Sequence, residues 1–310
     1  MHDIKLIRKN PDYFKKKISE RNSTVDIEKL LDLDKKNREL IQNKEKLEQE
    51  KKIISQKKDK SLFEKSKTLS LDIDKLVNDQ TIVKKQIESL LNSLPNIAKD
   101  DVPIGKDESK NKEIKKVGDI PKFSFKPLSH NDLGKKNGQM DFDIAVKTSG
   151  ARFVFLKNDL ALLERAISNF MLDTHTKDFG YKEISPPLIV NDDTMFGTGQ
   201  LPKFESDQFE LKLEDEKSRK FLIPTAEVIL TNIVRDSFIN KDDLPLRLVA
   251  STACFRKEAG SHGKDTKGMI RQHQFYKVEL VSIVKPNDCI KELDRMTNCA
   301  QEILNKLKLP

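Results

Sequence analysis

Five residues in the last quarter of the chain alternate along one predicted strand and combine an aromatic ring with positive and negative charge. They are Arg271, His273, Phe275, Lys277 and Glu279, and side chains two positions apart on a strand share a face. Phe275 could stack on a base, Arg271 could hold phosphate oxygens, and Glu279 could bind an ammonium or a hydroxyl group. At roughly 3.3 Å per residue, Phe275 and Glu279 would be about 13 Å apart. That separation suits a nucleobase joined through phosphate to an aminoacyl group.

This strand is predicted over residues 269–284, and an earlier strand is predicted over residues 248–256. The Gly- and charge-rich residues 257–268 between them indicate a hairpin with a long loop. In an extended backbone Arg256 and Glu258 would point the same way, so that the arginine could clamp a phosphate and the carboxylate could accept from an amine or help to hold a metal. An Arg-x-Glu by itself more often forms a solvated cross-strand ion pair. The neighbouring strand is what favours the binding role.

Residues 224–227, with the sequence Pro-Thr-Ala-Glu, precede a helical pattern. Thr225 is a suitable N-cap residue, and Glu227 in the first turn would be stabilised by the helix dipole. This structural explanation is sufficient for the segment taken alone. The predicted hairpin makes it a candidate for ligand binding.

The first hundred residues predict two long helices instead of a globular core. Between Ile27 and Leu94 there is neither Gly nor Pro. Apolar residues recur every seven positions in two stretches, which are Leu33, Leu40, Leu47 and Ile54, then Leu76, Val83 and Leu90. A polar break around residues 55–70 separates them. The pattern predicts an antiparallel two-helix coiled coil, about 45 Å long at 1.5 Å per residue.

The turn end of this predicted arm is basic. Residues 51–67 contain seven lysines against Asp59 and Glu64. A basic tip suits phosphate contacts whose affinity falls steeply with salt, and lysines that merely keep a helix end solvated would give the same pattern. The arm alone leaves both interpretations open. The candidate contacts are Lys51, Lys52, Lys57, Lys58 and Lys60.

Composition limits the class of protein. The length of 310 residues predicts about two domains, and the 35% of charged residues indicates a solvated helical region beside a core. The net charge of +8 favours an anionic partner such as nucleic acid, although the chain is rich in lysine throughout. The three cysteines have no zinc-site spacing and predict reduced thiols in the cytoplasm. No signal-peptide pattern or long apolar run is present, so no membrane partner is expected.

Two further segments organise the rest of the chain. Residues 95–118 are polar and predict a linker. From Asn158 the sequence predicts a globular part that begins with a helix whose apolar face contains Leu160, Leu163 and Ile167. Residues 181–190 then predict a strand interrupted by two prolines.

Five segments, in order, carry a resemblance to a known family: 181–190 (YKEISPPLIV), 197–204 (GTGQLPKF), 225–227 (TAE), 255–260 (FRKEAG) and 269–279 (MIRQHQFYKVE). Together they resemble bacterial-type seryl-tRNA synthetase, a class II aminoacyl-tRNA synthetase. The resemblance covers nearly the whole chain, including the helical arm. The order and spacing of five motifs make it specific, whereas the GTGQ segment alone would match many glycine-rich loops.

The resemblance implies an α+β fold in two domains. Residues 1–110 would be an antiparallel two-helix coiled-coil arm, and residues 111–310 a partial class II catalytic domain built on an antiparallel sheet. Such a protein is a cytoplasmic homodimer, a serine–tRNA ligase that uses ATP and Mg²⁺ to form seryl-adenylate from L-serine. It then transfers the seryl group to the 3′ end of tRNA(Ser), and the family also allows charging of tRNA(Sec).

Site residues carry over from the motifs of this family. ATP would contact Arg256, Glu258, Arg271, Gln272 and Phe275, with Arg256 as the catalytic residue. Serine would contact Thr225, Ala226, Glu227 and Glu279. Pro187 would belong to motif 1 at the dimer interface, and the arm would reach the long variable arm of the tRNA. No metal ligand is assigned.

The sequence ends before motif 3 of this family, so a fragment with an incomplete site and an open apolar sheet edge is expected. Two other functions compete with that of an active synthetase. A non-catalytic tRNA-binding relative would have no reason to keep Arg256, Glu258 and Glu279 together. A ligase that loads a carrier protein would lack the long arm and would use a metal-bound amine site.

Overall fold

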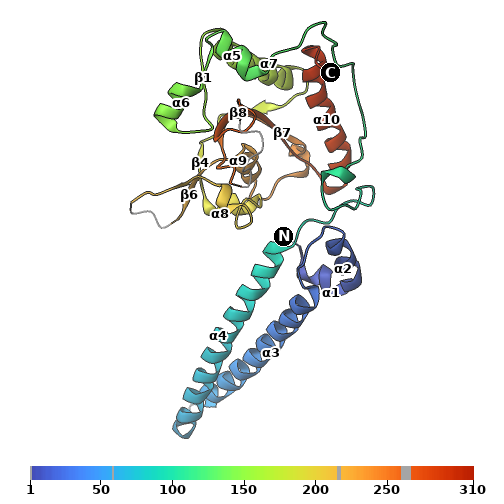
Figure 1. Cartoon of the computed structure of the whole chain (residues 1–310). Helices are drawn as coiled ribbons and strands as arrows, with labels where there is room; N and C mark the ends of the chain where they lie inside the picture. The colour runs from blue at the N-terminus through green and yellow to red at the C-terminus, as the bar shows by residue number, and fades with distance from the viewer. Residues whose placement is uncertain (1, 58, 215–217, 260–266) are drawn as a thin grey trace. The chain divides into compact units, whose positions relative to one another are not determined.

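The computed structural model describes residues 2–57, 59–214, 218–259 and 267–310. The chain divides into two compact units, Met1–Lys116 and Val117–Pro310. Figure 1 follows the chain from the blue N-terminal helices to the red C-terminal helix. The functional domains predicted over residues 1–110 and 111–310 stay a prediction.

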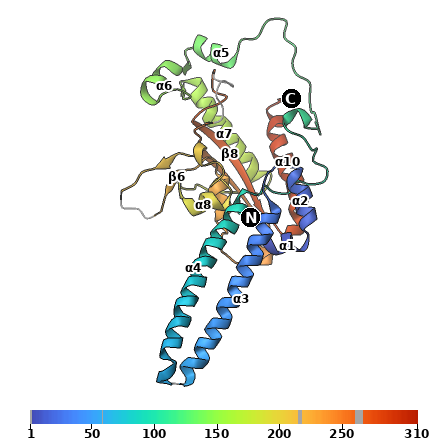
Figure 2. The same ribbon diagram turned by 60° about the horizontal axis from the view of Figure 1, so that its bottom comes forward.

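The N-terminal unit is helical and is dominated by two helices of equal length. Its elements are α1 (Ile4–Lys9), α2 (Pro11–Ser19), α3 (Ile27–Lys57), η1 (Lys60–Leu62), α4 (Phe63–Ser93) and η2 (Glu108–Lys110). Helices α3 and α4 have 31 residues each, which corresponds to about 46 Å at 1.5 Å per residue. They lie side by side and run in opposite directions (Figures 1 and 2).

The predicted pair of helices is therefore present, but the break between them is shorter than expected. Helix α3 continues to Lys57 and α4 begins at Phe63, whereas the sequence placed the break at 55–70. Polar residues are tolerated on the outer face of a helix, so a loss of apolar periodicity does not by itself end one.

The base of the arm holds its main apolar core. Helices α1 and α2 pack there against the ends of α3 and α4 through Ile7, Phe14, Ile18, Ile27, Leu30, Val83, Ile87, Leu91 and Leu94. Asp34 is buried beside this core, where Arg8 donates to both of its oxygens at 2.8 and 2.9 Å. Further along α3 the inward positions Asn37, Lys44 and Lys51 are only half-buried. The arm is thus well packed at its base and thin beyond it.

The C-terminal unit mixes helices and short sheets. Its helices are α5 (His130–Lys136), α6 (Phe142–Ser149), α7 (Asp159–Lys177), α8 (Asp192–Gly197), α9 (Glu227–Asn232) and α10 (Cys289–Lys306), with 3-10 turns η3 (Glu205–Asp207), η4 (Lys241–Asp243) and η5 (Pro286–Asp288). Its strands are β1 (Met140–Asp141), β2 (Phe155–Leu156), β3 (Lys182–Glu183), β4 (Ile189–Asn191), β5 (Glu210–Leu211), β6 (Lys220–Leu222), β7 (Leu246–Phe255) and β8 (Gln274–Ile283).

The central sheet has the order β3-β7-β8. Strands β7 and β8 pair antiparallel over ten residues each, from Leu246 opposite Ile283 to Phe255 opposite Gln274. Strand β3 pairs parallel to the other edge of β7. The predicted hairpin and the predicted α+β fold with a helical arm and a partial sheet domain are confirmed.

The second strand of the hairpin is shorter than predicted. Strand β8 begins at Gln274, and residues 270, 271 and 273 form bends. Arg271 and His273 therefore do not lie on the strand face that the alternation assigned to them, whereas Phe275, Lys277 and Glu279 do. Residues 260–266 of the predicted loop lie outside the described residues.

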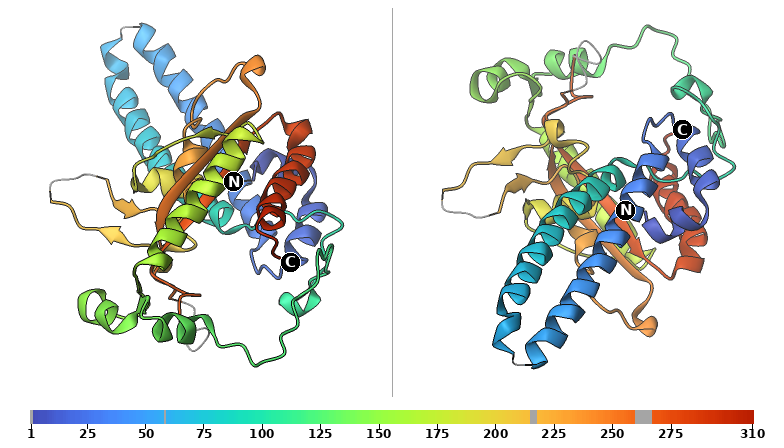
Figure 3. Two further views of the ribbon diagram at one scale, coloured as in Figure 1. Left: turned by 90° about the horizontal axis from the view of Figure 1, so that it is seen from above. Right: turned by 90° about the horizontal axis from the view of Figure 1, so that it is seen from below.

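Helix α7 lies across this sheet, as Figure 3 shows. It packs with β7 and α10 around Tyr181, Val249 and Cys299. The predicted helix is confirmed, although Asn158 makes no side-chain cap bond because its backbone has a φ of 52°. Helix α9 packs against the hairpin through Ala226, Leu230 and Ala250.

The proline-interrupted segment after α7 joins two sheets. Strand β3 ends at Glu183 in the central sheet, and β4 begins at Ile189 in the second sheet, which has the order β4-β6-β5. Proline cannot donate to a ladder, so Pro186 and Pro187 suit the crossing between the sheets. Among the described residues, no helix combines the length and the apolar character needed to cross a membrane.

Candidate active site

The candidate site is built on the face of β8 that carries Phe275, Lys277 and Glu279. The residues opposite them on β7 are Cys254, Thr252 and Ala250. All three are buried. The three larger side chains of β8 therefore lie beside small, buried side chains of β7.

Arg256 lies just beyond the end of β7, beside Phe275. Its guanidinium carbon is 5.4 Å from the centre of the Phe275 ring, and its Nε donates to the Pro224 carbonyl at 3.3 Å. The backbone N–H of Arg256 donates to the His273 carbonyl at 2.9 Å. These contacts hold an arginine next to an aromatic face, and the binding of a phosphate and a base there stays a prediction.

A pocket of about 530 Å³ opens at this point. It is lined by Glu164, Arg256, Glu258, Met269, Ile270, Arg271, Gln272, Phe275 and Tyr276. All five predicted ATP-binding residues thus line one pocket. Gln272 is 6% exposed, and its buried side-chain amide nitrogen has no hydrogen-bond partner among the described residues. A buried donor without a partner costs free energy.

Glu258 lines this pocket, but its backbone conformation differs from the extended one that was predicted. Its φ of 52° is left-handed, so Arg256 and Glu258 do not lie on one extended strand. The Glu258 carboxylate instead accepts from Arg271 at 2.9 Å, and Arg152 donates to the Glu258 carbonyl at 3.1 Å. Arg271 therefore joins the site from a bend through its contact with Glu258.

Asp207 anchors the same segment, although nothing in its sequence spacing singled it out. The N–H of Lys257 donates to the Asp207 carbonyl and that of Ala259 to the Asp207 carboxylate, both at 2.8 Å. Asp207 thereby holds both ends of the backbone that carries Glu258.

A second polar group lies further along β8, around Thr225. The Thr225 hydroxyl donates to Glu279 Oε2 and accepts from Lys277 Nζ at 2.8 Å. Lys277 Nζ is also 2.5 Å from Glu279 Oε2. The N-cap position of α9 is Ala226, one residue after the predicted Thr225, but the Thr225 hydroxyl does accept from the Glu227 N–H at 3.4 Å. The same hydroxyl also faces the two charged groups of β8.

Glu227 begins α9 and is exposed, whereas Ala226 beside it is fully buried. Partial desolvation in the pocket, and then the Glu279 carboxylate, raise the pKa of Glu227. Lys277 and Arg256 act in the opposite direction and lower that pKa. Arg256 thus lines the larger pocket and also acts on the Glu227 carboxylate, which links the two parts of the site.

The arrangement can hold three chemical groups in series. An aromatic ring and two arginines suit a base and phosphates, and two carboxylates suit an ammonium group. Among the described residues no cluster of three or more His, Cys, Asp or Glu side chains could hold a metal ion by itself. A divalent ion would therefore depend on ligands from a bound phosphate.

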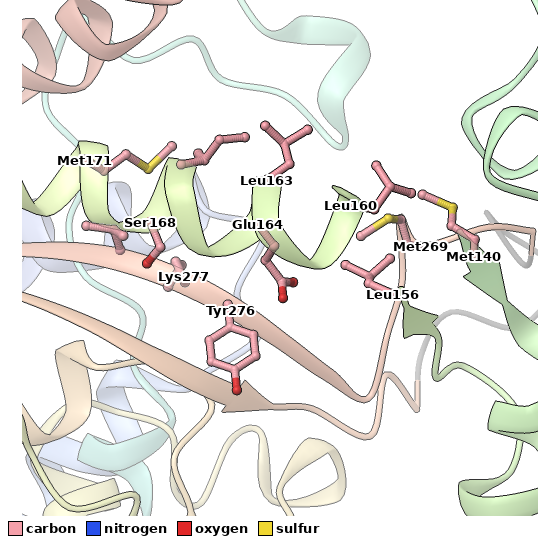
Figure 4. A pocket seen from close by; sticks show the side chains of 12 residues that line it. Met140, Leu156, Leu160, Leu163, Glu164, Ser168, Met171, Met269, Tyr276 and Lys277 are labelled. Carbon is pink, nitrogen blue, oxygen red and sulfur yellow. The ribbon is translucent and has the colours of Figure 1, made fainter. Parts of the chain in front are cut away.

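A separate, mostly apolar pocket of about 330 Å³ lies between α7 and β8. In Figure 4, Met140, Leu156, Leu160 and Met269 gather at one end of it, and Ser168 and Met171 line the other end. Leu163 on the same helix is 50% exposed. Pro187, the predicted interface residue, is exposed.

Only part of the predicted basic tip can be placed. Lys52 and Lys57 are exposed and Lys51 is half-buried. Lys58 lies outside the described residues, as does the side chain of Lys60. Nearby, Lys65 forms an ion pair of 2.7 Å with Glu50 across the two helices.

Comparison with known proteins places this fold and site in a class. Residues 208–310 match the family model of the tRNA synthetase class II core domain (G, H, P, S and T), so this part of the chain is a class II aminoacyl-tRNA synthetase core domain. Residues 1–98 match the seryl-tRNA synthetase N-terminal domain. The chain belongs to the seryl-tRNA synthetase family.

Individual relatives support this assignment. The serine–tRNA ligase of Pelagibacter ubique is 62% identical over the whole chain, which spans 74% of that relative. The serine–tRNA ligase of Parvibaculum lavamentivorans is 46% identical, with the same coverage. The seryl-tRNA synthetase of Pyrococcus horikoshii, solved with ATP, aligns with a TM-score of 0.88 at 33% identity, over 99% of this chain and 75% of that one.

Proposed function

We propose that the chain activates L-serine with ATP to form seryl-adenylate and then transfers the seryl group to the 3′ end of tRNA(Ser). The observation that carries the proposal is the single face of β8, on which Phe275 adjoins Arg256 and Glu279 adjoins Thr225 and Glu227. A base, a phosphate and an ammonium group would each find a matching partner there. Relatives at 62% and 46% identity are serine–tRNA ligases.

ATP would occupy the pocket of about 530 Å³. Phe275 would stack on adenine, and Gln272 would line the pocket beside it. Arg256 and Arg271 would bind phosphate oxygens, and Glu258 would keep Arg271 in place through its ion pair. The Pyrococcus horikoshii structure was solved with ATP.

Serine would occupy the group around Thr225. Its ammonium would lie between Glu227 and Glu279. A cation there would favour the ionised form of both carboxylates, which their like charges disfavour. Ala226 is fully buried, so it would support the pocket by packing beneath these side chains. A pocket that hydrogen-bonds the serine hydroxyl can reject alanine by roughly 10⁴–10⁵, whereas threonine must be excluded by space, which is a weaker filter.

In the reaction, a serine carboxylate oxygen attacks the α-phosphorus, and the bond to the bridging oxygen breaks to release pyrophosphate. Negative charge develops on the α-phosphate oxygens, where Arg256 would donate. Mg²⁺ bound with ATP would neutralise phosphate charge. Glu258, a carboxylate that lines the pocket, would help to hold this ion. A hydroxyl at the 3′ end of the tRNA then attacks the seryl carbonyl and releases AMP.

The helical arm would bind the long variable arm of the tRNA. Its exposed Lys52 and Lys57, with Lys51, would meet phosphates. A second copy of the chain would cover α7, where Leu162 and Leu163 are exposed beside the apolar pocket. Pro187 would belong to the same homodimer interface.

The test is equilibrium binding of a seryl-adenylate analogue in which a sulfamoyl group replaces the phosphate. We expect this chain to bind it at least about 10-fold more tightly than the alanyl analogue, the scale of one hydrogen bond to a charged partner. Equal affinity for both, or no binding, would contradict the proposal. The second candidate is a non-catalytic tRNA-binding protein, which predicts tRNA binding without binding of the analogue.

A further inference from the structure

Lys277 carries no assigned ligand contact, yet its side chain contacts both Thr225 and Glu279 of the proposed serine site. Its Nζ donates to Thr225 Oγ1 at 2.8 Å and is 2.5 Å from Glu279 Oε2. Its side chain is 33% exposed, while the Thr225 residue is 3% exposed. A lysine side chain in this place is held by two polar partners at once.

The direction of these hydrogen bonds follows from elementary chemistry. A lysine ammonium can only donate, so the Thr225 oxygen must accept from Lys277. The single hydroxyl hydrogen of Thr225 is then left to donate, and it does so to Glu279 Oε2. The Glu227 N–H also approaches the same Thr225 oxygen, at 3.4 Å. The hydroxyl of Thr225 is thereby committed within the protein, and its role is to hold Glu279.

Both contacts made by Lys277 and Thr225 to Glu279 fall on Oε2. The carboxylate is therefore fixed through one oxygen, and the other oxygen is oriented by that attachment. Removal of Lys277 would free the Thr225 hydroxyl to rotate, and Glu279 would lose both its orientation and its nearest cation.

Lys277 also contributes to the charge around Glu279. Its Nζ is 2.5 Å from Glu279 Oε2, and Lys277 and Arg256 together oppose the negative charge of Glu227 and Glu279. Without Lys277 the two carboxylates would compete for a proton, because like charges close together disfavour ionisation.

Resting on the proposed serine-activating function, we infer that Lys277 is a positioning residue of the serine site, which orients Glu279 both directly and through Thr225. The specificity of the pocket for an amino acid then depends on three residues of this chain acting together. The phosphate and adenine end does not depend on them.

The experiment compares Lys277→Met and Lys277→Arg with the unaltered chain, using isothermal titration with the seryl sulfamoyl analogue and, separately, with ATP. Lys277→Met keeps the length of the stem and removes the charge. We expect it to bind the seryl analogue about 10- to 100-fold more weakly, the scale of a charge-assisted hydrogen bond. Its affinity for ATP should stay within about 2-fold, a change of less than 1 kcal/mol. Lys277→Arg should recover part of the loss, and Lys291→Met on α10 serves as the matched control.

A pH series separates positioning from simple packing. The charged groups that act on Glu227 are Glu279 and Lys277 of β8 and Arg256 beyond β7, and α8, which also packs against α9, adds none among the described residues. Lys277 lowers the pKa of Glu227. Its removal should therefore raise the pH below which affinity for the analogue falls as Glu227 becomes protonated. Lys277→Arg keeps the charge and should leave this pH unchanged.

The outcomes are distinguishable. Failure of the unaltered chain to bind the seryl analogue would count against the proposed function. If the unaltered chain binds it and Lys277→Met binds equally well or more tightly, the inference about Lys277 is wrong. An equal loss of affinity for ATP would also overturn it, since Lys277 would then support the fold as a whole and not the serine pocket.

Discussion

Arg256 lies between two parts of the site, because its guanidinium faces the Phe275 ring while its Nε donates to the carbonyl of Pro224. Both contacts restrict its rotamers before any ligand arrives. A donor that is already in place needs little reorganisation when charge develops on a phosphate, and this is the main source of its effect on a reaction rate.

Arg256→Ala should slow serine-dependent ATP–pyrophosphate exchange by at least ~10²-fold, the usual effect of losing one such donor. Arg256→Lys should recover little, since an ammonium cannot form the two parallel bonds of a guanidinium. Exchange is measured in this chain and in the same chain extended by the segment that the longer Pelagibacter ubique relative carries. Arg235→Ala, an exposed arginine, is the control. Near-normal exchange by Arg256→Ala would remove this residue from the reaction.

Individual residues show what the sequence can and cannot predict. Alternation along β8 identified the shared face of Phe275 and Glu279, because a strand fixes which face a side chain takes. It placed Lys277 on the same face but could not show its contact with Thr225, which comes from a distant segment. The left-handed backbone at Glu258 and the anchoring role of Asp207 depend on loop geometry that no periodicity encodes.

At the scale of elements, β7, β8 and α10 are joined by a charged cluster. Glu292 of α10 is 7% exposed and accepts from Arg247 at 2.8 and 2.9 Å, from Ser282 at 2.9 Å and from Arg295 at 3.0 Å. These donors, Arg247 above all, lower the pKa of Glu292 to about 2. The cluster connects the helix to both strands of the hairpin.

Glu292→Gln should therefore lower the free energy of unfolding at pH 7 by on the order of 3 kcal/mol. The pKa of Glu292 is depressed in the folded state, so its contribution is complete above the ordinary value of 4.5 and is lost as the pH falls towards about 2. Urea unfolding at pH 7 and at pH 3 measures this. The difference between Glu292→Gln and the unaltered chain should shrink at pH 3, and exposed Asp294→Asn should show no such trend. An equal difference at both pH values would contradict the assignment.

Long elements could be predicted from the sequence and short ones could not. The arm and the hairpin have sustained periods of seven and two, respectively. Strands β3 to β6 have only two or three residues each, too few to establish a period, and their pairing is determined by contacts between distant segments. Residues 181–190 were expected to form one interrupted strand, yet they supply strands to two different sheets.

At the scale of the whole molecule, the basic tip should determine how tRNA binding depends on salt. Replacing Lys51, Lys52 and Lys57 by alanine should weaken binding of tRNA(Ser) and reduce the slope of log affinity against log salt by about 1 for each phosphate that the tip no longer neutralises. Filter binding between low and moderate salt measures the slope. Alanine at Lys35, Lys75 and Lys84 removes the same charge elsewhere on the arm. If both triple variants lose affinity equally, the arm acts only through its total charge.

The exposed apolar side chains of α7 lead to a prediction about assembly. Leu163→Glu should disrupt the proposed homodimer, because it places a charge beside the apolar pocket at the centre of that surface. Sedimentation velocity should show a monomer for this variant. Leu213→Glu changes a comparably exposed leucine after β5. A Leu163→Glu chain that sediments like the unaltered dimer would place the interface elsewhere.

The main apolar core of the arm lies at its base, and beyond it the described buried apolar side chains are Ile54 and Leu69. The arm is therefore held mainly at its base. Thermal motion is largest at the end that is not held, so the lysines near the turn would move through a larger volume than residues near the base. An RNA approaching from solution would then be captured over a larger radius than a rigid surface provides, and the entropy of those excursions would be lost when it binds. Apolar residues at the half-buried polar positions between α3 and α4 would stiffen the arm. The volume over which it captures RNA would then be smaller, and the complex would last longer.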